Sequence, residues 1–185
     1  MVLPIVAYGD PVLRKVGAEI TKDYPGLEKL IDDMYETMEK AKGVGLAAPQ
    51  IGKSIKLFII DSTRMHDEDE KKEGLKEVFI NPTMIEETGD DWAYEEGCLS
   101  IPSIREDVYR QDKIKIHYYD RNFKLHKKEF TGLTARVIQH EYDHVIGKLF
   151  IDRLKPLKRN LLKGKLDKIS KGIVDVEYKM KFPKA

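Results

Sequence analysis

The chain has 185 residues, 33 of them basic and 32 acidic, for a formal net charge of +1. That length fits one domain spanning 1–185 with its own core, and the balanced charge provides no global field for nucleic acid or membrane. No apolar run approaches the ~20 residues of a membrane-spanning helix. With a single cysteine and no leader pattern at its start, the chain is expected in the reducing cytoplasm.

The first strong helical pattern covers 26–42, and Gly43 can end it. Its apolar residues recur at helical spacing and are expected to face the core: Leu27, Leu30, Ile31, Met34, Met38 and Ala41. A loop, Gly43-Val-Gly-Leu-Ala-Ala-Pro-Gln50, follows directly. Because glycine lets another chain approach closely, we expect this loop to pair its backbone with an extended ligand. Gln50 adds a neutral amide donor at its end.

Apolar or alternating runs predict strands at 54–60, 78–80, 113–119 and 123–130. Asn81-Pro82 is expected to stop the second strand, and 61–76 is interpreted as a charged surface loop. The last two strands form a hairpin around a turn at 120–122. We interpret His117 and His126, which lie in this hairpin, as half-exposed strand residues and not as ligands.

A central amphipathic helix is predicted for 131–147, with Thr131 able to cap its start and Gly147 placed to end it. It contains His140-Glu141-Tyr142-Asp143-His144, which matches H-E-x-x-H. At ~100° per residue, the two histidines lie on one face of the helix, one turn apart, where they can hold one metal ion. Glu141 flanks them, within reach of a water on the metal. The plainer alternative is a surface helix with two solvated histidines.

A second helix is predicted for 156–171, although Gly164 weakens the case for a continuous one. Its apolar positions are expected to pack on the body of the protein: Leu157, Leu161, Leu166 and Ile169. Seven basic residues between 155 and 171 make its other side positive. We interpret that side as a solvated face in preference to a docking surface for an anionic partner. Alternation in 174–182 predicts a final strand.

A catalytic metal of this kind usually has three protein ligands and an open position. No histidine follows His144, and Asp167 and Glu177 belong to segments interpreted as surface. Cys98, in Glu96-Gly-Cys-Leu-Ser100, is the better candidate for the third ligand. A lone cysteine is often a buried apolar filler, but the neighbouring H-E-x-x-H pattern favours a thiolate ligand.

Three stretches together resemble the signature motifs of the peptide deformylase family, in the family's order and spacing. They are Gly43-Val-Gly-Leu-Ala-Ala-Pro-Gln50, Glu96-Gly-Cys-Leu-Ser100 and Gln139-His-Glu-Tyr-Asp-His144. The resemblance implies an α+β fold of antiparallel sheets around the central helix 131–147. It also implies hydrolysis of the N-formyl group from formyl-methionine at the start of nascent polypeptides, with release of formate.

The resemblance implies that Cys98, His140 and His144 hold the metal and that Glu141 is the general base and acid. Ferrous iron is the implied metal, with zinc, nickel or cobalt able to substitute. The Gln50 amide and the backbone N–H of Leu99 are expected to bind the formyl oxygen. Four further residues are expected at the substrate: Val44, Gly45 and Gly97 through their backbones, and Arg105 beside the cleft.

Two departures from the family pattern leave the subclass open: the insertion at 61–76, and a strand after 173 where other members end in a helix. Two other classes also remain open. A metallopeptidase would need a ligand downstream of His144, and a non-catalytic metal or ribosome-associated binding protein would use the basic face of 155–171. For an enzyme, a secondary hypothesis beside the solvated face is that this basic helix draws the protein to ribosomal RNA, and no membrane partner is expected.

Overall fold

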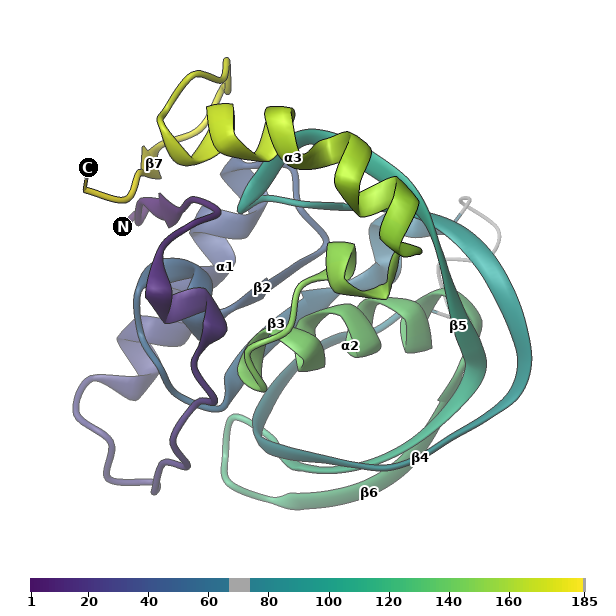
Figure 1. Ribbon diagram of the computed structural model, residues 1–185. Helices are drawn as coiled ribbons and strands as arrows, with labels where there is room; N and C mark the ends of the chain where they lie inside the picture. The colour runs from purple at the N-terminus through teal and green to yellow at the C-terminus, as the bar shows by residue number, and fades with distance from the viewer. Residues whose placement is uncertain (67–73, 185) are drawn as a thin grey trace.

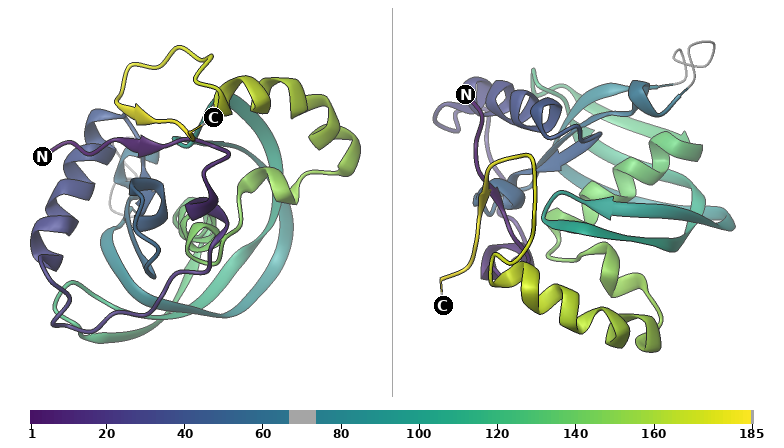
Figure 2. Two further views of the ribbon diagram at one scale, coloured as in Figure 1. Left: turned by 60° about the vertical axis from the view of Figure 1, so that its left-hand side comes forward. Right: turned by 90° about the horizontal axis from the view of Figure 1, so that it is seen from above.

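Helix α2 (Gly132–Val145) lies at the centre of the fold, and Figure 2 shows it almost end-on inside a ring of strands. The structure, a computed structural model, describes residues 1–66 and 74–184. Most residues of α2 are buried, so the predicted central helix is confirmed. Thr131 occupies the N-cap position, but its side chain makes no capping hydrogen bond. Gly147 follows the helix with φ +78°, a left-handed conformation that glycine adopts without strain.

Five antiparallel strands surround this helix in the order β2-β3-β4-β5-β6. They are β2 (Gly45–Ala47), β3 (Leu57–Asp61), β4 (Lys76–Cys98), β5 (Ile101–Tyr119) and β6 (Leu125–Thr131). The long strands β4 and β5 curve together around α2 (Figure 1). The predicted α+β class, with antiparallel strands around a central helix, is confirmed.

The predicted end of a strand at Asn81-Pro82 is wrong, because β4 continues from Lys76 to Cys98. Its pairing with β5 shifts between Ile80 and Thr83, and Asn81 has φ +48°. At this irregularity Pro82, which has no N–H, does not interrupt a regular ladder. The Asn81 side chain also pairs with both backbone groups of Ile20, which ties the irregular segment to the N-terminal region.

The other predicted strands differ mainly in length. The hairpin of 113–119 and 123–130 is confirmed as the end of β5 paired with β6. In 174–182, only β7 (Met180–Lys181) is a strand, and it pairs in parallel with β1 (Ile5–Val6). Of the predicted loop 61–76, the first residue belongs to β3 and a 3-10 helix, η3 (Ser62–Met65), follows. Residues 67–73 of that loop lie outside the described residues.

Helices α1 (Leu27–Lys40) and α3 (Pro156–Ser170) confirm the two other predicted helices, and α3 is continuous through Gly164. The apolar face of α1 is buried as expected. The face predicted for α3 is partly wrong, because Leu157 and Leu161 are 74% and 71% exposed. The buried residues of α3 are Leu162, Leu166 and Ile169.

Three short 3-10 helices complete the fold: η1 (Pro11–Arg14), η2 (Ala48–Ile51) and η5 (Phe150–Arg153). One apolar cluster lies beneath α1, a second beneath α3, and a third between α2 and the sheet. Within 1–66 and 74–184, no helix has both the length and the apolarity needed to cross a membrane. These clusters enclose α2, so its histidines lie in the interior of the molecule.

Candidate metal centre and active site

The structure brings Cys98, His140 and His144 together, with one potential ligand atom from each residue lying within 4.8 Å of the others. Cys98 ends β4, and its Sγ lies 3.4 Å from Nε2 of His144. The two imidazole rings come from successive turns of α2, with centroids 5.2 Å apart. Asp167 and Glu177 are not part of this group, since they pair with lysines elsewhere.

These three residues fit a divalent transition metal by the chemistry of their donors. Burial lowers the pKa of His144 to about 3, so its imidazole is neutral and can donate a lone pair. Its Nδ1 has no hydrogen-bond partner among the residues that the structure describes. One sulfur and two imidazole nitrogens form a set that suits zinc, ferrous iron and similar ions.

Glu96 orients His140 from behind the metal centre. Its Oε1 lies 2.9 Å from Nδ1 of His140, which leaves the other ring nitrogen free to face a metal. Burial alone would raise the pKa of Glu96, but hydrogen bonds from His140 and Arg110 hold that pKa well below its usual range. Glu96 is therefore a buried carboxylate that accepts a hydrogen bond from His140, as a carboxylate behind a metal-binding histidine commonly does.

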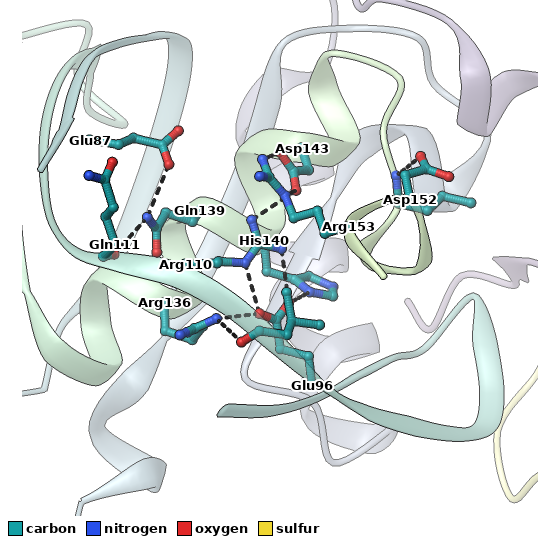
Figure 3. A network of polar contacts seen from close by, with 12 residues as sticks. Glu87, Glu96, Arg110, Gln111, Arg136, Gln139, His140, Asp143, Asp152 and Arg153 are labelled. Carbon is teal, nitrogen blue, oxygen red and sulfur yellow. Dashed lines mark hydrogen bonds and ion pairs between the residues drawn. The ribbon is translucent and has the colours of Figure 1, made fainter. Parts of the chain in front are cut away.

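Glu96 belongs to a buried network of charges beside His140 (Figure 3). Arg110, whose side chain is fully buried, donates to both oxygens of Glu96 at 2.8 and 3.0 Å and to Asp143 at 2.9 Å. Arg136 donates to Glu96 at 2.9 Å, and Arg153 donates to both oxygens of Asp143 at 2.7 Å. Glu96 and Asp143 thus each have two arginine partners.

Glu141 lies on the cavity side of α2, where its carboxyl group is buried and one oxygen has no hydrogen-bond partner in the described part of the chain. Burial raises the pKa of Glu141 to about 7. Gly45 makes room for this group, because a Cβ atom at position 45 would lie 2.5 Å from Oε1 of Glu141. A larger residue in the glycine-rich loop would displace the carboxylate.

Gln50 and Leu99 line the same cavity as Cys98. The Gln50 side chain is fixed at both ends: Oε1 accepts from the backbone N–H of Ala47 at 2.9 Å, and Nε2 donates to Ser100 Oγ at 3.2 Å. The same Nε2 lies 3.5 Å from Sγ of Cys98. The amide donor therefore lies beside the sulfur of the predicted metal ligand. Leu99 follows Cys98 in the turn between β4 and β5.

A cavity of about 580 Å³ opens over this centre. All of the predicted site residues line it except His144, which lies beneath: Val44, Gly45, Gln50, Gly97, Cys98, Leu99, Arg105, His140 and Glu141. Arg105 is exposed at the rim and pairs with Glu95 at 2.8 Å. Neither His117 nor His126 belongs to the metal group, and both are half-buried strand residues, as interpreted from sequence.

Sequence reasoning missed two groups of residues here. The first group consists of three arginines that belong to no sequence motif: Arg110, Arg136 and Arg153. Two of their carboxylate partners do lie inside the motifs at 96–100 and 139–144. The second group is the cavity wall formed by Asp175–Tyr178, where the hydroxyl of Tyr178 donates to the backbone carbonyl of Leu99 at 2.7 Å. Burial raises the pKa of Tyr178, so the hydroxyl keeps its proton.

Comparison with known proteins places this arrangement in context. Residues 2–160 match the family model described as polypeptide deformylase. The chain is 56% identical over 192 residues to the peptide deformylase of Christiangramia forsetii, covering 100% of this chain and 98% of that protein. It is 55% identical over 183 residues to the peptide deformylase of Cytophaga hutchinsonii, covering 99% of this chain and 98% of that protein.

Among solved structures, the peptide deformylase from Legionella pneumophila has a TM-score of 0.79 at 38% identity, covering 94% of this chain and 98% of that one. Plant peptide deformylase PDF1B has a TM-score of 0.83 at 31% identity, covering 96% of each.

Proposed function

This chain belongs to the peptide deformylase family, and from that premise we propose how its own residues carry out the reaction. The enzyme hydrolyses the N-formyl group of formyl-methionine at the N-terminus of nascent polypeptides and releases formate. The convergence of Cys98, His140 and His144 beside the buried Glu141 is the observation that supports this assignment of roles. We also propose that 1–185 acts as a single catalytic domain in the cytoplasm.

Cys98, His140 and His144 hold one divalent ion in this proposal, with ferrous iron as the natural metal and zinc, nickel or cobalt as substitutes. When bound, such an ion acts as a Lewis acid and lowers the pKa of a coordinated water towards ~7. Cysteine adds a negative charge to the ligand set and favours a softer ion than three histidines would. The hydrogen bond from His140 to Glu96 supports the role of His140, because it fixes the ring orientation.

Glu141 moves the proton in the proposed reaction. Its carboxylate takes a proton from the attacking water while the oxygen of that water bonds to the formyl carbon. The C–N bond of the formamide then breaks, and Glu141 delivers the proton to the departing amine, leaving formate and a free N-terminus. The burial of Glu141 and its unpartnered oxygen, within the described residues, support this role.

Gln50 and Leu99 stabilise the charge that develops on the formyl oxygen. The Nε2 group of Gln50 is held toward the metal centre by its contacts with Ala47 and Ser100, and the backbone N–H of Leu99 is the second donor. Loss of one such donor typically lowers turnover by ~10²–10³. Both donors belong to residues held by other contacts, which limits how far they move when the substrate arrives.

The peptide substrate pairs with the backbones of Val44, Gly45 and Gly97 as an added strand. Strand β2, which includes Gly45, is at the edge of the sheet, so its outer side is available for an extended chain. Arg105, exposed at the rim, offers a positive charge to the substrate beyond the methionine.

The test is a formate-release assay on a formyl-methionyl peptide, run beside the unformylated peptide with metal analysis of the same samples. We expect Glu141→Gln to abolish formate release while metal content and thermal stability stay near those of the wild type. Cys98→Ala should lose the metal as well as the activity. Cleavage of the unformylated peptide, or full metal retention by Cys98→Ala, would point to a metallopeptidase instead.

We further propose that the basic face of 155–171 draws the enzyme to ribosomal RNA. All seven basic side chains of this face are exposed, although Lys158 also pairs with Glu106 at 3.0 Å. Reversing the charges of Lys158, Arg159 and Lys163 should reduce co-sedimentation with ribosomes at low salt. The same charge change at Lys127 and Lys128 of β6 and at Lys124, which directly precedes β6, is the matched control. Equal co-sedimentation of both variants would contradict this proposal.

A further inference from the structure

Residues 174–178 cross one side of the active-site cavity and contribute Asp175, Val176, Glu177 and Tyr178 to its lining. This wall follows α3 and lies beyond residue 160, outside the part of the chain that matches the family model. The wall therefore adds contacts to the site that the three sequence motifs do not contain.

Tyr178 joins the wall to the turn that carries Leu99. The hydroxyl of Tyr178 donates to the backbone carbonyl of Leu99 at 2.7 Å. Leu99 and Ser100 form the tight turn between β4 and β5, across which Cys98 pairs with Ile101. Leu99 is also the residue whose N–H is proposed to bind the formyl oxygen. Tyr178 thus contacts the backbone of a residue that is assigned to the reaction.

Further contacts hold Ser100, the residue that follows Leu99 in the turn. The Ser100 carbonyl accepts from the backbone N–H of Tyr8 at 2.8 Å, and its hydroxyl contacts Gln50. The side chain of Leu99 packs on Gly43, where an added Cβ would lie 2.8 Å from Cδ1 of Leu99. The N–H of Leu99 belongs to the peptide plane that Leu99 shares with Cys98, and Cys98 pairs with Ile101 across the turn. With the carbonyl and the side chain of Leu99 also held, rotation about its N–Cα bond, which sets the direction of the N–H, is restricted.

Tyr178 is itself held by the pairing of the two ends of the fold. Two residues further on, Met180 pairs with Ile5. The backbone N–H groups of Ile5 and Ala7 donate to the carbonyls of Lys179 and Lys181, both at 2.9 Å. The half-buried ring of Tyr178 packs against the apolar cluster beneath α1. The ion pair between Glu177 and Lys42 is 3.1 Å long but highly exposed on both sides, so it contributes little.

We propose that Tyr178 is a positioning residue for deformylation, whose hydroxyl fixes the Leu99 backbone so that its N–H is aimed at the developing oxyanion before the substrate binds. This inference rests on the proposed role of Leu99. Donors that are oriented in advance act more strongly on a transition state than donors that must reorganise. A backbone donor cannot be removed by substituting its own side chain, so Tyr178 also offers a way to test the role of Leu99.

The experiment compares Tyr178→Phe with the wild type, since this change removes the hydroxyl and keeps the ring. A hydrogen bond of this kind is worth a rate factor of roughly 3 to 10. We expect kcat to fall about 3- to 10-fold, with KM for the formyl-methionyl peptide, metal content and melting temperature close to those of the wild type. Tyr119→Phe is the matched control, because Tyr119 is also half-buried against the same apolar cluster but lies at the far end of β5.

Hydrogen exchange provides a readout that does not depend on turnover. Amides in the peptide covering 97–101 should exchange faster in Tyr178→Phe than in the wild type or in Tyr119→Phe. If the wild type is active but Tyr178→Phe keeps both its kcat within twofold and its exchange at 97–101, the role of Tyr178 is overturned. A kcat loss that merely follows lost metal or a lower melting temperature also overturns it. An inactive wild type would instead overturn the proposed function on which it rests.

Discussion

Gly45 and Glu141 are packed so closely that one added carbon atom at position 45 would collide with the carboxylate of Glu141. A Cβ at position 45 would lie 2.5 Å from Oε1 and 2.8 Å from Cδ of Glu141, shorter than any ordinary contact. We expect Gly45→Ala to displace the carboxylate and lower kcat at least ~10-fold, because a misplacement of ~1 Å at a reacting group can cost 10²-fold.

Formate release and metal content of Gly45→Ala should be measured together, since the ligands themselves are untouched by this change. Gly164→Ala is the control, because a Cβ at position 164 meets no atom within 4 Å. A Gly45→Ala enzyme as fast as the wild type would show that the carboxylate has another acceptable position.

Arg110 is expected to contribute strongly to the stability of the folded protein. Its fully buried guanidinium pairs with Glu96 and Asp143, so Arg110→Met leaves two buried carboxylates short of a partner. Removing one partner of a buried ion pair typically costs ~3–5 kcal/mol. We therefore expect the free energy of unfolding to fall by about that amount, measured by denaturant titration.

Arg121→Met is the matched comparison, because Arg121 also pairs with two carboxylates but lies at the surface. Exposed pairs contribute ~0–1 kcal/mol, so this variant should change stability little. Similar losses for the two variants would contradict the view that burial makes the network important.

The sequence predicted single residues well where the motifs specify their spacing. His140 and His144 meet because four residues make about one helical turn, a local relation that needs no knowledge of the tertiary fold. Arg110 could not be found in this way, since it lies 14 residues from Glu96 and 33 from Asp143. In sequence, an arginine on an alternating strand is indistinguishable from one on a solvated face.

Helix α3 shows the same limit at the scale of an element. The sequence contains two overlapping leucine stripes, one through Leu157 and Leu161 and another through Leu162 and Leu166, and both have helical spacing. Only the second is buried. Periodicity predicts that a helix has an apolar face, but the choice between two such faces depends on packing against the N-terminal segment and β5, which α3 contacts only in the folded chain.

Strand β4 was underpredicted for a related reason. A proline normally ends a strand, and the residues after Pro82 are largely polar. The structure places Pro82 at a shift in register and leaves the following residues on the outer part of a long curved hairpin, where polar side chains face solvent. Local patterns do not reveal that two strands of this length support one another.

Gly164 leads to a prediction for α3. This glycine lies inside a continuous helix with open space around its Cα, so alanine should fit without strain. Gly164→Ala is expected to raise the free energy of unfolding by ~0.5–1 kcal/mol, since glycine loses more backbone entropy in a helix. Thermal unfolding of the two proteins at equal metal content provides the measurement. A lower melting temperature for Gly164→Ala would indicate that α3 needs flexibility at this point.

A bound metal is expected to stabilise the whole molecule, because its ligands join the end of β4 to the central helix. An ion that binds only the folded state stabilises it by ~4 kcal/mol at a free concentration 1,000 times Kd. Removing it with a chelator should therefore lower the melting temperature by roughly 8–16 °C for a domain of this size. Cys98→Ser, with a weakened site, should respond much less to the chelator. An unchanged melting temperature after verified metal loss would argue against such coupling.

The parallel pair of β1 and β7 also orders events during synthesis. Ile5 pairs with Met180, so the first strand leaves the ribosome long before its partner has been made. At ~5–20 residues per second, that strand waits roughly 10–35 s. With the role proposed for Tyr178, the oxyanion donor stays loosely oriented throughout this interval. A catalyst for newly started polypeptides would thus reach full competence only after its own residues 178–181 have been made and have paired with β1.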